Sequence, residues 1–449
     1  MKKVITYGTF DMLHHGHINL LRKAKLLGDY LIVGVTTDNF DINRGKLNVQ
    51  QSLMERIQAL KDTGLVDEVI LEEYSGQKID DIRRYDIDIF AIGSDWVGKF
   101  DYLNEYCTVI YIERTKGISS TQIRNASQII NLGIAGYSPM VEKFISESKY
   151  VSGIVIKGIY LEDEQEILDY LTKESCDIIT TNYDDLLDIV DAVYVISKPA
   201  SRFALVKKAL INKKHVLCES PIALGNKQAR ELLDLAVGNN CTLFEAIKTA
   251  YVLAFSRLTL LIKSGEIGAV KSIEASCTSL TSKNSWLYSK DNGGGSLTAW
   301  GSIALLPILK ILGTDYIKCD YVSQVDAING VDLFTKINLI YPSSVASLKV
   351  GIGVKSEGDL IVSGTKAYLY VPSPWWKTDY FEVRYEDFTN NKRYFYKLEG
   401  EGLRYEMAAF LKAIRTKNKN FYIEENVTLG ISMIMEDFFN ETNSKVIIK

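Results

Sequence analysis

Three of the four histidines in this chain, His14, His15 and His17, fall within four consecutive positions. Histidines scattered through a core would not gather in this way, so the cluster indicates a site. It lies in the loop GTFDMLHHGH, between a strand-like stretch at 3–7 and apolar residues at helical spacing from 18 to 27. The start of a helix attracts anions, and Gly16 lets a phosphate approach the backbone closely. The loop therefore predicts a phosphate site.

The spacing of the histidines also suggests their chemistry. His14 and His17 are three residues apart, so both can point to one side of the helix start. Imidazole N–H donors there can neutralise the charge that develops on phosphate oxygens as pyrophosphate leaves. Such a transfer needs positioning and electrostatics, with no covalent intermediate.

Two segments resemble the signatures of a known superfamily. Residues 7–11 (YGTFD), followed by His14-x-Gly16-His17, resemble the first signature of the cytidylyltransferases, and residues 114–121 (RTKGISST) resemble the second. Together with residues 93–96 (GSDW), they resemble the glycerol-3-phosphate cytidylyltransferases over residues 1–128. Only the flanking histidines fit the motif, so His15 is interpreted as structural or solvent-facing.

The resemblance implies a role for each matching residue. His14 and His17 would hold the α- and β-phosphates in the transition state, while Lys46 and Arg114 would bind phosphate. The acceptor would meet Arg44 and Lys78, and Arg56 is a further candidate site residue without a stated role. The remaining nucleotide contacts would come from Thr9, Phe10, Gly16, Asp95, Trp96, Thr115, Ser119, Ser120 and Thr121.

Two departures from the family pattern fall on the acceptor side. Ser75 stands where the family often has an aromatic residue, and the stretch 44–56 is about one residue longer. The acceptor therefore stays open between glycerol 3-phosphate and longer polyol phosphates. Mg²⁺ would arrive with CTP, without a dedicated protein metal site and with Asp11 as an outer-shell group.

Composition and length narrow the class of protein. A chain of 449 residues predicts two or three domains, and a net charge of −4 argues against a general nucleic-acid or membrane-surface binder. No apolar run approaches the roughly 20 residues that span a bilayer. Six scattered cysteines without a CxxC pair indicate reduced thiols in the cytoplasm.

The alternation of strands and helices predicts an α/β protein. Strands at 3–7, 30–36, 66–70, 87–93 and 107–112 predict a Rossmann-like open parallel sheet in a domain spanning 1–128, with ligands at the carboxyl ends of the strands. Ser52 and Glu55 form a capping box, which predicts a helix from Leu53. The join at 119–131 is expected to be a short helix running into a strand.

A second α/β alternation begins at 130–136 and continues with strands at 154–160, 192–197, 214–218 and 242–246. It predicts a second Rossmann-type domain over 129–250. Longer β segments follow from residue 272, which predicts an α/β domain over 251–449 with a large, mostly antiparallel sheet. That open sheet is the expected face of a homodimer or higher oligomer.

Several segments of this half resemble the Gfo/Idh/MocA oxidoreductases: 132–136 (LGIAG), 191–195 (DAVYV), 214–221 (KHVLCESP), 264–268 (SGEIG) and 293–295 (GGG). The resemblance implies a dinucleotide-binding domain followed by an α/β domain. Residues that would do the chemistry differ, however. Ser138 and Pro139 interrupt the phosphate turn, and the catalytic positions of the family fall at Ser220, Ala299 and Ile303. Glu162 or Asp163 could still bind a ribose.

Three functional hypotheses follow. In the first, a cytidylyltransferase makes a CDP-alditol for bacterial surface polymers such as teichoic acid or capsule, and its second half is a degenerate reductase. In the second, the second half is an active NAD(P)H-dependent reductase that supplies the polyol phosphate. In the third, the chain is a scaffold with a vestigial nucleotidyl domain.

Overall fold

The computed structural model describes residues 1–37, 40–41, 49, 51, 53–74, 76–113, 129–163, 176–396, 398–416, 422–440 and 444–448. The chain divides into two compact units: Met1–Ile129 with Tyr150–Gly153, and Ile130–Lys149 with Ile154–Lys449. Predictions on Arg44, Lys46, Ser52, Ser75 and residues 114–128 lie outside the described residues. The predicted boundary between residues 250 and 251 stays a prediction.

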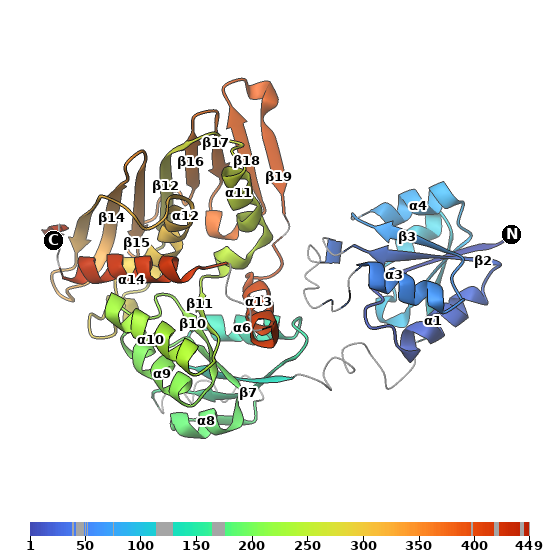
Figure 1. The fold of residues 1–449 in the computed structure, drawn as a ribbon, viewed down its shortest axis with the longest axis horizontal. Helices are drawn as coiled ribbons and strands as arrows, with labels where there is room; N and C mark the ends of the chain where they lie inside the picture. Colours follow the sequence, from blue (N-terminus) through green and yellow to red (C-terminus); the bar gives the residue numbers. More distant parts are fainter. Residues whose placement is uncertain are drawn as a thin grey trace. The chain divides into compact units, whose positions relative to one another are not determined.

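The first unit is built on a parallel five-stranded sheet, in the order β3-β2-β1-β4-β5, which confirms the predicted architecture (Figure 1). Its strands are β1 (Lys3–Gly8), β2 (Tyr30–Thr36), β3 (Glu68–Glu72), β4 (Ile89–Gly93) and β5 (Thr108–Ile112), and its helices are α1 (His15–Lys25), α3 (Leu53–Asp62) and α4 (Gln77–Tyr85).

Apolar residues cover both faces of this sheet. One hydrophobic cluster joins Leu21 of α1 and Leu60 of α3 to the sheet, and a second joins Ile82 of α4 to the opposite face. The chain order of the strands reverses between β1 and β4. In an open α/β sheet, ligands bind outside the carboxyl ends of the strands at such a switch point.

The second unit begins with a parallel six-stranded sheet in the order β11-β10-β9-β6-β7-β8. Its strands are β6 (Ile130–Ala135), β7 (Ile154–Tyr160), β8 (Ile178–Thr180), β9 (Ala192–Val195), β10 (His215–Glu219) and β11 (Leu243–Ala246). The helices are α6 (Pro139–Ser148), α8 (Tyr183–Ile189), α9 (Pro199–Ile211) and α10 (Asn226–Gly238). The predicted second Rossmann-type sheet is thus confirmed, although sequence analysis missed the three-residue β8.

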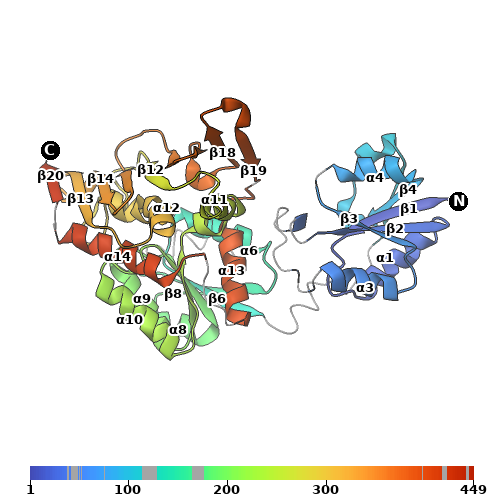
Figure 2. The same cartoon turned by 45° about the horizontal axis from the view of Figure 1, so that its top comes forward.

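A nine-stranded sheet follows, in the order β19-β18-β17-β16-β12-β15-β14-β13-β20 (Figure 2). Most neighbours are antiparallel, but the pairs β12–β15 and β13–β20 are parallel, so the sheet is mixed. Its strands are β12 (Val270–Thr278), β13 (Lys318–Val325), β14 (Asp332–Ile340), β15 (Val345–Gly351), β16 (Leu360–Gly364), β17 (Ala367–Val371), β18 (Tyr380–Tyr385), β19 (Lys392–Phe395) and β20 (Ser444–Ile448).

Four longer helices accompany the nine-stranded sheet: α11 (Leu253–Lys263), α12 (Ser302–Leu312), α13 (Leu403–Thr416) and α14 (Glu425–Phe439). Helix α13 packs against α6, and α14 packs against α10. Helices from the last part of the chain therefore contact helices that accompany the six-stranded sheet. In the part of the chain that is described, no helix has the length and apolar character to cross a membrane.

Candidate functional site

The histidine loop joins β1 to α1. His14 is the N-cap of α1, and its Nδ1 accepts hydrogen bonds from the backbone N–H groups of Gly16 (3.1 Å) and His17 (3.4 Å). The two imidazoles stack, with ring centroids 3.9 Å apart and planes at 18°. The helix therefore begins at His15, ahead of the apolar periodicity, because a histidine supplies the cap.

These hydrogen bonds define which nitrogen of His14 can donate. Because Nδ1 accepts, the hydrogen of the neutral imidazole is on Nε2. The first turn of α1 contains no acidic residue, whereas Arg22, Lys23 and Lys25 lie in its last turn. The positive end of the helix dipole is thus unopposed, and the arrangement suits an anion.

The backbone of the loop is strained. Phe10 (φ 51°) and Met12 (φ 48°) both adopt the left-handed conformation that non-glycine residues avoid. Packing holds them there: Phe10 is only 2% exposed, and its ring meets the ring of His17 edge-on at 5.4 Å. Strain maintained by the surrounding structure is typical of functional loops.

Arg56 supports this loop from beneath. Its side chain is fully buried, and Nη1 donates to the carbonyls of Thr9 and Thr36, each at 2.9 Å. Asp41 lies 3.7 Å from the same nitrogen and accepts from the hydroxyls of Thr9 (3.0 Å) and Thr36 (2.6 Å). Arg56 therefore positions the histidine loop through Thr9.

Sequence analysis named Arg56 as a candidate but missed Asp41 altogether. A signal for Arg56 was present, because it falls three residues after Leu53 and four before Leu60, on the apolar stripe of α3. An arginine on such a stripe is buried and needs a partner. Its partner, Asp41, carries no comparable signal in the sequence.

Lys78, predicted to face the acceptor, lies near the start of α4. It forms an ion pair with Oε1 of Glu72, the last residue of β3. Its Nζ lies 4.6 Å from the ring centroid of Tyr7 and 5.5 Å from that of Phe100. The Tyr7 hydroxyl in turn donates to Asp81 of α4 at 2.8 Å. Glu72, Asp81 and Phe100 of this group were not predicted from the sequence.

Asp95 and Trp96 lie in the short helix η1 (Ser94–Trp96), directly after β4. Both are exposed, and the Trp96 ring lies 5.9 Å from the ring of Phe100, the same ring that neighbours Lys78. The histidine loop, Lys78 and Trp96 thus follow the carboxyl ends of β1, β3 and β4. The described residues of the predicted site gather at one edge of the sheet.

Asp11 contributes a hydrogen bond within the loop. It is 2% exposed, and its Oδ1 accepts from the backbone N–H of Gln51 at 3.0 Å, while the Gln51 side chain accepts from the N–H of Met12 at 2.6 Å. Among the residues described, no three His, Cys, Asp or Glu side chains gather in a way that would hold a metal ion.

The corresponding turn of the second unit joins β6 to α6. Gly136 has φ 103°, and a Cβ there would lie 2.6 Å from backbone atoms of Ser197. Ser138 caps α6: its side chain accepts from the N–H of Met140 (3.1 Å), and its carbonyl accepts from the N–H of Val141 (2.9 Å). Pro139, the next residue, has no N–H to donate.

The three positions that depart from the family's catalytic residues (Ser220, Ala299 and Ile303) are half-buried, and the two candidate ribose-binding carboxylates are exposed. Ser220 donates a hydrogen bond to Oε1 of buried Glu245. Ala299 packs in an apolar cluster with Tyr288, Val331 and Ile352, and Ile303 is a half-buried residue of α12. Glu162 and Asp163 are exposed after β7.

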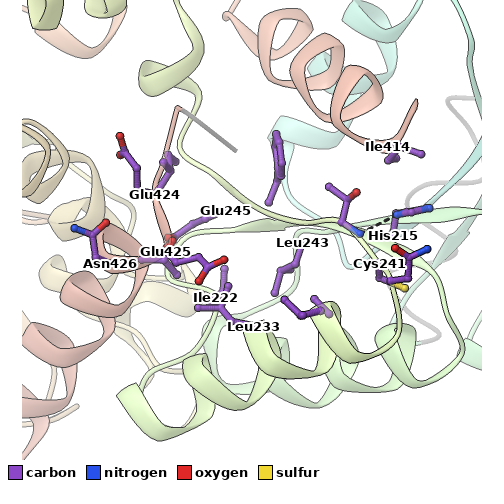
Figure 3. A pocket seen from close by; sticks show the side chains of 17 residues that line it. His215, Ile222, Leu233, Cys241, Leu243, Glu245, Ile414, Glu424, Glu425 and Asn426 are labelled. Carbon is purple, nitrogen blue, oxygen red and sulfur yellow. Dashed lines mark hydrogen bonds between the residues drawn. The ribbon is translucent and has the colours of Figure 1, made fainter. Parts of the chain in front are cut away.

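A pocket of this unit lies elsewhere. It opens beyond the edge strand β11, between α10 and the start of α14, and apolar side chains share its lining with polar ones such as His215, Glu245 and Glu424 (Figure 3). Nδ1 of His215 accepts from the N–H of Thr242 at 2.9 Å. None of the predicted site residues lines it.

Comparison with known proteins assigns the two halves. Residues 5–126 match the cytidylyltransferase-like family, and residues 130–247 match the oxidoreductase family with an NAD-binding Rossmann fold. The glycerol-3-phosphate cytidylyltransferase of Bacillus spizizenii is 57% identical over 124 residues, which are 28% of this chain and 95% of that protein. The Staphylococcus aureus enzyme is 49% identical over 124 residues, 28% of this chain and 93% of its own length.

The second unit has the fold of a solved 3-ketoreductase from Actinomadura kijaniata in complex with NADP and TDP-benzene. The TM-score is 0.65 at 18% identity, and the match covers 72% of this chain and 100% of that one. At this identity the match describes the fold. The chain belongs, through its first unit, to the glycerol-3-phosphate cytidylyltransferase family of nucleotidyltransferases, and it carries a Gfo/Idh/MocA oxidoreductase fold behind that unit.

Proposed function

We propose that the first unit transfers CMP from CTP to a polyol phosphate, releasing pyrophosphate and a CDP-alditol, with glycerol 3-phosphate as the leading acceptor. The observation that carries the proposal is the stacked pair His14–His17 at the anion-attracting start of α1. The names of the relatives support CTP and glycerol 3-phosphate as substrates.

In the proposed reaction, an oxygen of the acceptor phosphate attacks the α-phosphorus of CTP in line with the departing pyrophosphate. The Nε2–H of His14 and the adjacent imidazole of His17 donate to the phosphate oxygens as negative charge builds up on them. Thr9 and Phe10 would contact the nucleotide through the backbone, while Trp96 and Asp95 would flank the base or ribose. We assign supporting roles to Lys46, Arg44, Arg114, Thr115, Ser119, Ser120 and Thr121 from the resemblance.

A magnesium ion fits this site only as a companion of the nucleotide. The single carboxylate of the loop, Asp11, is largely committed to Gln51, which agrees with Mg²⁺ bound mainly by triphosphate oxygens and water. When bound, the ion would neutralise charge on the triphosphate.

The pair Lys78–Glu72 supports an acceptor that carries hydroxyl groups. Glu72 is 1% exposed, and its Oε2 has no hydrogen-bond partner among the described residues. A hydroxyl both donates and accepts, so it can donate to this oxygen and accept from the lysine ammonium group. An acceptor rich in hydroxyls, such as a polyol phosphate, would satisfy both groups at once.

An acceptor screen tests the proposal. CTP is combined in turn with glycerol, ribitol, arabinitol, mannitol and glucitol phosphates, and pyrophosphate release is measured for the wild type and for His17→Ala. We expect release with at least one polyol phosphate and its loss in the variant. Absence of release from the wild type with every acceptor would favour the hypothesis of a scaffold with a vestigial domain. Unchanged release in His17→Ala would contradict the role proposed for His17.

For the second unit we propose a structural or substrate-handling role, because its phosphate turn does not fit a dinucleotide bound in the usual Rossmann manner. The Ser138 side chain takes the N–H that a pyrophosphate would use, Pro139 supplies none, and Glu142 puts negative charge in the first turn. The alternative is an NAD(P)H-dependent reductase, which the family match and the retained Gly136 favour. Fluorescence titration with NADH and NADPH, followed by turnover of a ketose or triose phosphate, distinguishes the two.

We further propose that the product feeds a bacterial surface polymer such as teichoic acid or capsule, and that the protein acts in the cytoplasm as a homodimer or higher oligomer. The open face of the nine-stranded sheet is the candidate interface. Light scattering with variants in that face tests the oligomer.

A further inference from the structure

Three lysines of the second unit converge on one carboxylate. Glu401, in the segment that precedes α13, forms ion pairs with Lys143 of α6 (2.8 Å), Lys248 (3.2 Å) and Lys377. Lys248 follows β11 in the short helix η3 (Lys248–Tyr251), and Lys377 belongs to η6 (Trp375–Lys377). Helices α6 and α13 lie side by side in Figures 1 and 2, and they are in contact.

The cluster holds more positive charge than Glu401 neutralises. Glu147, the nearby carboxylate of α6, is already engaged with the backbone N–H groups of Glu401 (2.5 Å) and Arg404 (3.0 Å) and with the Arg404 guanidinium (3.3 Å). The side chain of Lys248 is only 14% exposed, and burial together with Lys377 lowers its pKa. Like charges held together in a partly buried place favour the binding of an anion.

Glu401 is the anion that the three lysines surround in this structure. Burial alone would raise its pKa, but the three lysines outweigh that effect and lower it to about 2. Gly400 (φ 63°) and Gly402 (φ 87°) flank it in conformations that glycine adopts readily. The side chains of Lys143 and Lys377 are 48% and 34% exposed, so the cluster can be reached from solvent.

A second observation indicates what the rest of a bound anionic ligand would contact. Glu406, on the first turn of α13, is 1% exposed, and neither of its carboxyl oxygens has a hydrogen-bond partner in the described part of the chain. It interacts electrostatically with Lys248 and Glu219, and burial raises its pKa well above the usual range. A buried carboxyl group without partners is satisfied by a ligand hydroxyl or by water.

We propose that Lys143, Lys248 and Lys377 form a binding site for a phosphate monoester, that Glu401 occupies this site when no ligand is bound, and that Glu406 receives a hydroxyl of the ligand. The ligand class is a small phosphorylated polyol or sugar. The site lies wholly within the second unit and requires neither a dinucleotide nor the nucleotidyl transfer proposed for the first.

Calorimetric titration of the full-length chain tests the site, with sn-glycerol 3-phosphate, inorganic phosphate and glycerol as probes. Glu401→Gln removes the internal competitor, and we expect it to tighten one class of phosphate-binding site by about tenfold. Lys377→Gln should weaken the same class by a similar factor. The matched control is Lys318→Gln, a surface lysine whose ion pair with Asp320 lies elsewhere on the nine-stranded sheet.

Comparison of the probes shows whether the site recognises the phosphate group alone or also the hydroxyl groups of the ligand. Tighter binding of glycerol 3-phosphate than of inorganic phosphate supports recognition of the hydroxyls by Glu406, and Glu406→Leu should reduce that difference. Equal binding of the two overturns the role of Glu406 but supports the lysine site.

The proposal as a whole is overturned if Glu401→Gln and Lys377→Gln leave phosphate binding unchanged, or if Glu401→Gln only lowers the melting temperature, because the cluster is then a structural clasp. Pyrophosphate release from CTP, measured on the same variants, reports on the first unit independently. Failure of one proposal can therefore be told from failure of the other.

Discussion

The turn after β1 and the turn after β6 begin in the same way and end differently. Each leads from the first strand of a parallel sheet into a helix, where an anion would be expected to bind. In the first turn the cap is His14, whose Nδ1 accepts from the backbone N–H groups of Gly16 and His17, and the first helical turn has no acidic residue. In the second the cap is Ser138, followed by Pro139 and Glu142.

The two turns therefore differ in the residue that caps the helix and in the charge of the first helical turn. His14 caps its helix through Nδ1, and imidazole has a second nitrogen at the far side of the ring. Ser138 caps its helix through a single oxygen, which also carries the only hydrogen that its side chain can donate. Buried support also differs: Arg56 and Asp41 hold the first loop, whereas Gly136 holds the second turn by close backbone packing.

The largest effect is expected on stability, from the loss of the buried pair Arg56–Asp41. Replacing Arg56 with Met should destabilise the first unit by about 3–5 kcal/mol, because Asp41 is left buried without its partner. Denaturant unfolding measures the loss, with the exposed Arg22→Met as the control. An Arg56→Met protein of normal stability and normal pyrophosphate release would contradict the role assigned to this pair.

Removing the imidazole should affect chemistry more than folding. We expect His17→Ala to reduce kcat by about 10²–10³-fold, the usual effect of deleting a donor to developing negative charge. The neighbouring His15→Ala is the matched control and should retain activity, since His15 is exposed. Equal losses in both variants would mean that the stacked pair has no special role.

The acceptor side should respond through KM. Lys78→Met removes the charge held between Tyr7 and Phe100, and we expect the KM for the polyol phosphate to rise about tenfold with little change in the KM for CTP. Glu72→Gln should raise the same KM by a smaller factor. A rise in the KM for CTP alone would place Lys78 on the nucleotide side instead.

The smallest effect is expected in the turn between β6 and α6, where Ser138 caps the helix. Ser138→Ala should lower the free energy of unfolding of the second unit by about 1 kcal/mol through loss of the cap, and Ser138→Gly by only a few tenths. Thermal unfolding gives both values, and NADPH titration of the glycine variant shows whether opening the turn restores binding. A stability unaffected by Ser138→Ala would mean that the serine does not close the turn.

The parts of the molecule predicted from sequence are those with local signals. The apolar runs of β1, β2 and β4 identify buried parallel strands without reference to any other segment. The spacing of His14 and His17 likewise fixes their shared side of α1. Elements without such a local signal were missed. β8 has three residues, too few to show a pattern, and β20 depends on its pairing with β13 at the far end of the sheet.

The parts that could not be predicted depend on pairing across the fold. Glu72 meets Lys78 only because β3 ends beside the start of α4, and Asp41 meets Arg56 only after β1, β2 and α3 have come together. The cluster around Glu401 draws on lysines at 143, 248 and 377, which no spacing rule connects. The roles assigned to Lys46 and to residues 114–121 remain predictions from the resemblance.

Pyrophosphate release from CTP, with ATP as the competing nucleotide and glycerol 3-phosphate as the acceptor, tests the central claim most directly. We expect release that requires the polyol phosphate, prefers CTP over ATP and disappears in His17→Ala while His15→Ala retains it. A preference for ATP, or release that survives the loss of His17, would contradict the assignment of the turn between β1 and α1 as a cytidylyl-transfer site.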